Sequence, residues 1–370
     1  MTNKKLSYTI LTITFILVVI GHVMIYSASS YVAERDFGDA FYHVKKQLLG
    51  FFAGVALTVM IFFVKTETIE KFRWIILAFS TFLMLLVFVP GIGVESYGAK
   101  RWINLGFTTI QPSEIMKFAF VIFVSGYIKD KKCDSWKVIF TVLSVGGVIA
   151  VMLLMQPNMS ITVCLFGVMF IMLIVGGIKL KQLLILVVPF LLGAVLLILL
   201  EPYRLDRLFA FIDPWASPKE EGFQLIQSYY AIGSGGLFGV GLFNSRQKYL
   251  FLPFAESDFI FSVICEELGF VGCVIVLFLY ITLVVCGVKV AMNTLNAFDC
   301  YLATGITAII AVQTLINIAV VSGSIPPTGL PLPYMSAGGS SLAVFMMASG
   351  ILAKIGLKDK SHLKLLSHKI

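Results

Sequence analysis

The sequence predicts an all-α polytopic membrane protein with about ten transmembrane helices and a large extracellular loop between the seventh and the eighth. Hydrophobic residues make up 59% of the 370 residues and charged residues only 13%, a balance that a soluble globular domain does not need. Repeated apolar runs are long enough to cross about 30 Å of hydrocarbon. We therefore expect one integral membrane domain over residues 1–370.

Ten apolar runs supply the predicted spans. The fourth is shorter than the roughly 17 residues that a transmembrane helix needs, so nine or eleven spans are alternatives to ten. The first run lacks a cleavage site of small residues, and we expect it to remain attached as a span. The runs cover residues 8–27, 48–64, 74–90, 115–128, 138–155, 160–177, 183–200, 259–287, 301–321 and 338–355.

Positive charge is distributed unevenly over this topology. With both termini on one side, the segments of that side carry 17 Lys and Arg residues, and the short segments of the other side carry 5. Cytoplasmic segments are the ones enriched in Lys and Arg. We therefore expect a multi-pass protein of the cell membrane with cytoplasmic N- and C-termini, and we attribute the net charge of +8 to anchoring beside anionic lipid.

The composition also excludes some classes of function. No basic face with interleaved aromatic residues is present, so nucleic-acid binding is set aside. The six cysteines form no CxxC pair and the four histidines are scattered. Neither a disulfide framework nor a Cys/His metal site is indicated.

Polar, glycine and proline residues gather on the predicted outer side. Residues 325–341 contain four prolines, so they form no helix and are either a rigid loop that closes the top of the bundle or a plain connector. The extracellular loop 201–258 is too long to lack structure, and we expect short amphipathic helices in it, one over residues 222–232 on the membrane surface. For the glycine-rich residues 233–241, flexible, close-packing backbone is favoured over a phosphate-binding loop, because no βαβ unit surrounds them.

Three sets of ionisable residues are candidates for function. Asp258 stands where a polar run meets an apolar run, which places it at a membrane–water boundary as either a catalytic base or a helix N-cap. Glu114 and Lys117 share one face of a helix and form either a structural ion pair or the lining of a polar cavity. Glu266 and Glu267 serve either the packing of helices or the site.

Four groups of motifs follow one another along nearly the whole chain. They are YSASS (26–30), GAKRWINLG with QPSEIMK (98–117), NSRQKYLFLP with SDFIFSVICEELGFVG (244–272), and PPTGLPLPYMSAGGSS (326–341). Together they closely resemble the SEDS family (shape, elongation, division and sporulation) of FtsW, RodA and SpoVE, and most of all its FtsW/SpoVE branch. The resemblance implies a peptidoglycan glycosyltransferase that polymerises lipid II into glycan strands outside the membrane.

The resemblance also implies roles and a partner. The proposed catalytic aspartate of the family corresponds to Asp258, and the charged residues of its QPSE…K motif correspond to Glu114 and Lys117. The implied partner is a class B penicillin-binding protein, a transpeptidase.

The chain departs from the family pattern at two motifs. Phe254 replaces a glutamate, while Glu256 supplies a carboxylate two residues later. Gln156 and Asn158 stand where many members have acidic residues, so we expect no acidic contribution from that loop.

The chemistry of lipid II polymerisation requires few groups. A sugar hydroxyl attacks an anomeric carbon, and the lipid pyrophosphate leaves as a stabilised anion, so one base and some positive charge suffice. Asp258 is the candidate base, and a divalent cation, Mg²⁺ or Mn²⁺, is an additional candidate beside the basic side chains. The residues assigned to substrate binding or the cavity are Lys100, Arg101, Glu114, Lys117, Arg246, Lys248, Glu256 and Ser336.

Two other functions fit the same sequence. A flippase for lipid-linked precursors would also use polar residues in spans and a proline-broken loop. A noncatalytic scaffold for the transpeptidase would need apolar helix surfaces but not Asp258.

Overall fold

The computed structural model describes residues 3–96, 99–106, 108–131, 133–199 and 202–358. Each of the ten apolar runs forms the bulk of one helix, which confirms the all-α polytopic fold class. Six of these helices, α1, α2, α6, α11, α12 and α13, are long and apolar enough to cross a membrane. The ten helices are α1 Asn3–Phe37, α2 Tyr42–Phe63, α4 Arg73–Leu86, α5 Pro112–Lys129, α6 Trp136–Met155, α7 Met159–Val175, α8 Leu180–Leu199, α11 Ile260–Asn293, α12 Ala297–Val321 and α13 Gly339–Leu357.

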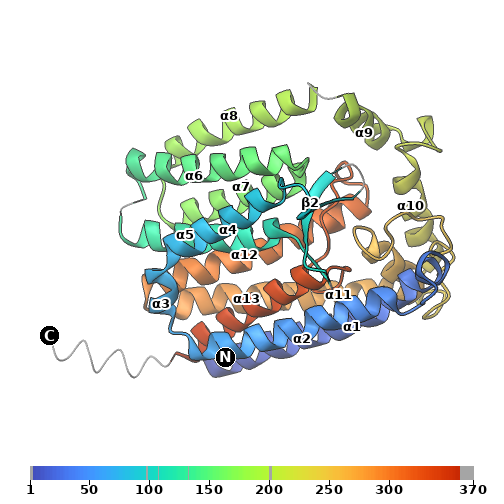
Figure 1. Ribbon diagram of the computed structural model, residues 1–370, viewed down its shortest axis with the longest axis horizontal. Coiled ribbons are helices and arrows are strands. Elements are labelled where there is room, and N and C mark those ends of the chain that lie inside the picture. Colours follow the sequence, from blue (N-terminus) through green and yellow to red (C-terminus); the bar gives the residue numbers. More distant parts are fainter. Residues whose placement is uncertain (1–2, 97–98, 107, 132, 200–201, 359–370) are drawn as a thin grey trace.

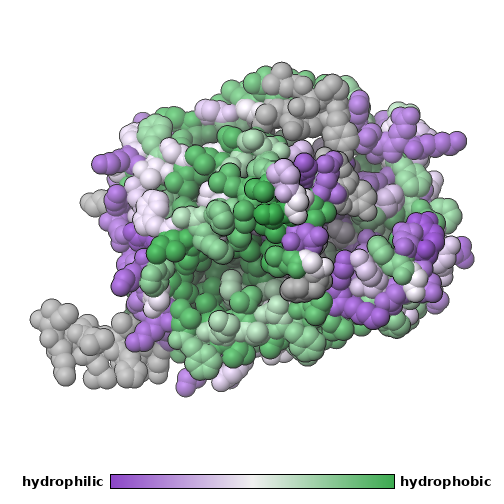
Figure 2. Space-filling view, in the orientation of Figure 1, coloured by the Kyte–Doolittle hydropathy of each residue, from purple (hydrophilic) through white to green (hydrophobic). Residues whose placement is uncertain are grey.

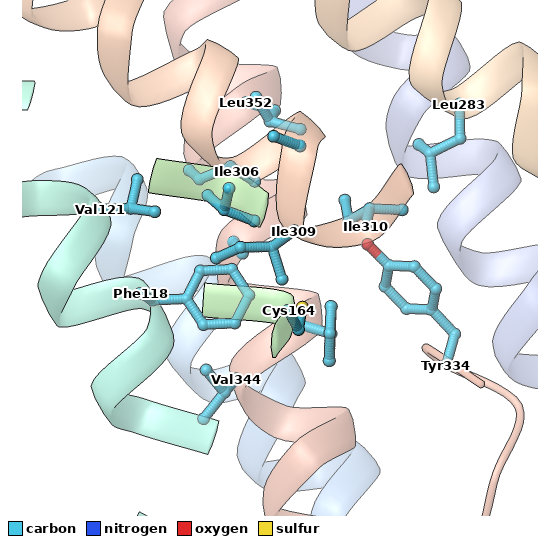
Figure 3. Close-up of a cluster of buried hydrophobic side chains, with 14 of the residues drawn as sticks. Phe118, Val121, Cys164, Leu283, Ile306, Ile309, Ile310, Tyr334, Val344 and Leu352 are labelled. Carbon is cyan, nitrogen blue, oxygen red and sulfur yellow. The ribbon is translucent and has the colours of Figure 1, made fainter. Parts of the chain in front are cut away.

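The helices run side by side along the longest axis of the molecule (Figure 1). Helix α5 is buried along almost its whole length, as expected for a helix that is apolar on all sides. Its Phe118 and Val121 face Cys164 of α7, Ile306 of α12 and Val344 of α13 in the core (Figure 3). Apolar side chains form a broad band across the middle, and polar side chains gather at both ends (Figure 2).

At one end of the bundle, side chains link α11 to α1 and α13 to α2. Asn293 at the end of α11 donates a hydrogen bond from its amide nitrogen to Asn3 Oδ1 at 3.1 Å. Lys354 in the last turn of α13 donates to the carbonyl oxygens of Ile61, Phe62 and Val64, at the C-terminal end of α2. The start of α1 and the end of α13 therefore lie at the same end of the molecule (Figure 1).

The opposite end holds irregular segments that link the helices. Strands β1 Gly93–Ser96, β2 Ala99–Asn104 and β3 Thr109–Ile110 form a small antiparallel sheet that the sequence did not predict. Between α8 and α11 the chain forms α9 Pro202–Ile212, the 3₁₀ helix η1 Pro214–Ala216 and α10 Phe223–Gly235, which overlaps the helix expected over 222–232. At the other end, α3 Thr66–Lys71 connects α2 to α4.

Helix α11 is broken at Gly269, whose φ of 66° lies in the left-handed region. The break frees the carbonyl oxygens of residues 266–267 and the N–H groups of residues 270–271 from helical pairing. The glycine-rich segment 236–241 satisfies all four, with N···O distances between 2.9 and 3.1 Å. A Cβ on Gly239 would stand 2.1 Å from the Glu267 carbonyl oxygen, so only glycine allows this close approach.

Candidate functional site

Asp258 lies in the turn that precedes α11, at the end of the bundle that carries the sheet. Its carboxylate accepts a hydrogen bond from Ser257 Oγ at 3.0 Å, and its backbone carbonyl accepts one from Asn317 Nδ2 at 2.8 Å. A Cβ on Gly329 would stand 3.2 Å from Asp258 Oδ2. The proline-rich loop between α12 and α13, residues 325–338, therefore covers one side of the carboxylate. Phe259, not Asp258, is the N-cap of α11, and it makes no side-chain cap, so the N-cap alternative is not what the structure shows.

The charge on Asp258 is set by opposing influences. Burial raises the pKa of the carboxyl group, and the nearby Glu256 raises it further, while the Ser257 hydrogen bond and the positive charges of Arg101 and Arg207 lower it. The net pKa lies above the ordinary value of 3.8. Asp258 as a whole residue is half-buried, so its surroundings do not close over it completely. Burial raises the pKa of Glu256 as well.

Arg101 belongs to strand β2 and is held by the loop between α6 and α7. Its Nε donates to the Gln156 carbonyl oxygen at 3.1 Å, and its Nη2 donates to the Pro157 carbonyl oxygen. The QPNMS segment therefore holds Arg101 through backbone carbonyl groups, and its Ser160 Oγ also donates to the Thr328 carbonyl oxygen. Neither contact needs an acidic side chain.

Arg207 is a residue near Asp258 that the sequence analysis missed. It lies on α9, where its Nη1 donates to the Pro327 carbonyl oxygen at 3.4 Å and its Nε stands 3.8 Å from Glu221. Arg207 lies on an amphipathic helix within the predicted extracellular loop, and this amphipathic pattern could have indicated it. Asn317 was also missed, because it lies within an apolar span.

The proline-rich loop is tied to the segment that carries Asp258. Ser336 Oγ donates to the Ser257 carbonyl oxygen at 2.6 Å and accepts from the Leu332 N–H at 2.7 Å. The Ala337 N–H donates to the Glu256 carbonyl oxygen at 2.8 Å. Ser336 therefore positions the backbone beside Asp258, and the loop is a fixed part of this end of the bundle.

Glu114 and Lys117 form a fully buried ion pair, with 2.9 Å between Lys117 Nζ and Glu114 Oε1. Ser341 Oγ donates to Glu114 at 2.8 Å, and Lys117 donates to Gln313 Oε1 at 2.5 Å. Gln313 in turn donates to the Pro331 carbonyl oxygen at 2.8 Å. The pair thus connects α5 to α12, α13 and the proline-rich loop, which favours the structural alternative.

Glu266 and Glu267 hold the loop that follows the glycine-rich segment. Glu267 accepts hydrogen bonds from Ser27 Oγ at 2.5 Å and from the N–H groups of residues 243 and 245. Glu266 accepts from Ser245 Oγ and from the Arg246 N–H. In this structure they fasten a loop onto α1 and α11, which favours the packing alternative.

Lys100, Arg246 and Lys248 are not among the charged groups that act on the Asp258 carboxyl group. Lys248 is buried, with its Nζ 3.6 Å from Glu267 and bonded to the Phe243 carbonyl oxygen, so it belongs to the loop attachment. Arg246 and Lys100 are exposed. Around Asp258 the structure brings together Glu256, Arg101, Arg207 and Ser336.

No group of three or more His, Cys, Asp or Glu side chains suited to a metal occurs among the residues that the structure describes. Asp258 and Glu256 are nevertheless two neighbouring carboxyl groups. Mg²⁺ commonly binds through one or two carboxylates together with substrate phosphates. Asp258 and Glu256 are therefore donors of the type that such a cation takes.

A bundle of apolar helices with a largely buried carboxyl group, influenced by two guanidinium groups, at one end defines a polytopic membrane protein with a polar site at that end of the bundle. The chain belongs to the cell cycle protein family of FtsW, RodA and SpoVE, whose model matches residues 8–361. This confirms the SEDS resemblance.

Relatives match over nearly their full length. The chain is 39% identical to "Stage V sporulation protein E" of Bacillus subtilis (strain 168) over 363 residues, which cover 96% of this chain and 98% of the relative. It is 38% identical over 358 residues to a protein of Geobacter sp. (strain M18) named "Probable peptidoglycan glycosyltransferase FtsW", covering 94% and 96%.

Solved structures share the fold. A chain from "Structural coordination of polymerization and crosslinking by a peptidoglycan synthase complex" superposes with a TM-score of 0.78 at 25% identity, covering 95% of this chain and 98% of that one. The rod shape determining protein RodA of Thermus thermophilus superposes with a TM-score of 0.69 at 24% identity, covering 95% and 97%.

Proposed function

We propose that this chain is a peptidoglycan glycosyltransferase that polymerises lipid II at the outer face of the cytoplasmic membrane, for cell division or sporulation. The observation that carries the proposal is the buried Asp258 carboxyl group, within electrostatic reach of Arg101 and Arg207, in a chain that matches a named glycosyltransferase over 94% of its length. The full-length relatives named for division and sporulation support this branch of the family.

Asp258 is the general base in this proposal. A free aspartate is a weak base, but burial raises the pKa of Asp258 toward the working pH, which strengthens it as a proton acceptor. The carboxylate takes the proton of the acceptor sugar hydroxyl as the oxygen attacks the anomeric carbon of the donor. The bond from that carbon to the pyrophosphate oxygen then breaks.

Arg101 and Arg207 stabilise the departing pyrophosphate. Guanidinium groups match phosphate oxygens with paired N–H donors and stay charged at any working pH. Both guanidinium groups act electrostatically on the Asp258 carboxylate. As the reaction moves negative charge from this carboxylate to the leaving pyrophosphate, the charge therefore stays close to the same two cations. This ranks them above Arg246 and Lys248, which lie on the loop fastened by Glu266 and Glu267.

A divalent cation, Mg²⁺ or Mn²⁺, is part of the proposal as an additional source of positive charge. Glu256, whose carboxyl group lies near Asp258, would hold it together with the substrate phosphates, and it would supply charge neutralisation to the pyrophosphate. Glu256 then takes the place of the family glutamate that Phe254 replaces.

We propose that the end of the bundle that joins α1 and α13 faces the cytoplasm. The 17 Lys and Arg residues of that side, against 5 in the short segments of the other, support this orientation. Asp258 then faces outward. We further propose a class B penicillin-binding protein as the partner, because the matching fold comes from a synthase complex that coordinates polymerisation with crosslinking.

The test is Asp258→Asn in purified full-length protein supplied with lipid II. We expect loss of glycan product with retained folding and partner binding, whereas the control Asp206→Asn on the exposed face of α9 retains activity. Full polymerisation by Asp258→Asn would contradict the proposal. A flippase would instead translocate lipid II in liposomes without polymerising it, and a scaffold would complement a deletion strain with the Asp258→Asn protein.

A further inference from the structure

Cys265 and Cys273 of α11 bury their thiols against one another, with 2.8 Å between the two sulfur atoms. In an unbroken helix, residues eight apart are separated by about 12 Å along the axis. The break at Gly269 is therefore what brings the two thiols into contact. The pair does not belong to the cluster around Asp258.

The two thiols lie on opposite sides of this break. The first segment of α11, residues 260–268, begins two residues after Asp258 and carries Glu266 and Glu267. The second segment continues to Asn293. Apart from the backbone at Gly269, hydrogen bonds to the loop at 236–246 hold the first segment, and Ser27 of α1 and Ser228 of α10 bond to its Glu267 and Ser262.

We propose that Cys265 and Cys273 are an oxidisable dithiol that closes to an intramolecular disulfide and fastens the two segments of α11 together. The two thiols give up two protons and two electrons as the S–S bond forms. A diazenedicarboxamide oxidant such as diamide accepts them and becomes the corresponding hydrazine. The sulfur atoms need to move closer by less than about 1 Å to reach bonding distance.

The position of the pair favours oxidation. Both cysteines lie in the half of α11 nearer to Asp258, which faces outward in the proposed orientation. Disulfides persist on the outer side of the cytoplasmic membrane, where the cytosolic reductants are absent. Cys164, buried in the core between α5, α12 and α13, is the internal control that stays a thiol (Figure 3).

The first experiment maps the bond. Full-length protein in membranes is treated with diamide, denatured with N-ethylmaleimide, and digested with chymotrypsin without reduction. We expect a cross-linked peptide pair that joins Cys265 to Cys273 and is lighter by two hydrogen atoms than the two free thiol peptides, with Cys164 fully alkylated. Cys265→Ser and Cys273→Ser should each lose the cross-linked species. Full alkylation of both cysteines after oxidation, or a bond from either to another cysteine, would overturn the proposal.

The second experiment tests whether the bond fastens the break. Amide hydrogen exchange is compared in reduced and oxidised protein for residues 240, 241, 270 and 271, whose N–H groups join the two sides of the break to the segment 236–241. We expect at least about tenfold slower exchange at these amides in the oxidised wild type, and no change in Cys273→Ser after the same treatment. Equal exchange rates in a protein shown to carry the disulfide would refute the mechanical role.

Discussion

The buried pair of Glu114 and Lys117 gives the sharpest test of how this bundle is held together. The charges are 2.9 Å apart and at most 1% exposed. At an effective dielectric constant of about 20, their attraction amounts to about 6 kcal/mol before the cost of desolvation. Lys117→Met removes one charge and leaves the Glu114 carboxylate buried without a counterion. We expect it to lower the free energy of unfolding by about 3 to 5 kcal/mol.

The double variant separates structure from catalysis. Glu114→Gln with Lys117→Met removes both charges and keeps an acceptor for Ser341, so we expect it to regain all but about 2 kcal/mol of the loss. The surface variant Lys129→Met, which breaks the more exposed Lys129–Glu70 pair, should cost less than about 1 kcal/mol. Unfolding is measured by titration with sodium dodecyl sulfate in mixed micelles, and glycan synthesis is measured in parallel.

One result would refute this reasoning. If Lys117→Met unfolds at the same detergent fraction as the wild type but makes no glycan, the pair lines a substrate cavity instead of holding α5 against α12 and α13. Recovery of stability without recovery of activity in the double variant would show that both roles coexist.

Further predictions concern the surroundings of Asp258. Gly329→Ala places a Cβ 3.2 Å from its carboxylate, so we expect at least about tenfold loss of kcat, whereas Gly38→Ala, equally strained but with open space around it, should leave polymerisation unchanged. Because the pKa of Asp258 is raised, polymerisation should fall as the pH drops through that pKa, at a higher pH than for an ordinary aspartate, which a pH–rate profile measures. Above the pKa of Asp258 in the folded protein, its ionised carboxyl group destabilises the folded state. Asp258→Asn should therefore melt at a higher temperature than the wild type at neutral pH, and this difference should shrink in acid. Glu267→Gln weakens the hold on Ser27 and the loop, and limited proteolysis near residues 243–248 should become faster.

The sequence predicts the helices well for a physical reason. In hydrocarbon every backbone N–H and C=O must bond within the segment, so an apolar run of sufficient length has essentially one regular structure open to it. The short sheet at residues 93–110 escaped prediction because it lies outside the apolar runs, where strand, turn and coil compete on equal terms. The all-α class holds, and the sheet is a local addition to it.

The site was predictable only in part. The position of Asp258 at the end of a polar run, and the family motif, both pointed to it. Arg207 carries no such signal, because its proximity to Asp258 depends on how α9 folds back over the proline-rich loop. The roles of Glu266 and Glu267 could not be decided from helical spacing, because their partners come from a loop about twenty residues earlier and from α1.

The surroundings of Asp258 have a consequence for biosynthesis. The groups that act on its carboxylate come from β2, α9 and a loop that follows α12, so they are spread over two thirds of the chain. During translation, a nascent chain that ends before Gly329 already contains Asp258 but not the proline-rich loop that covers one side of its carboxylate. Membrane insertion must therefore reach the loop that follows α12 before all of these groups are assembled around Asp258.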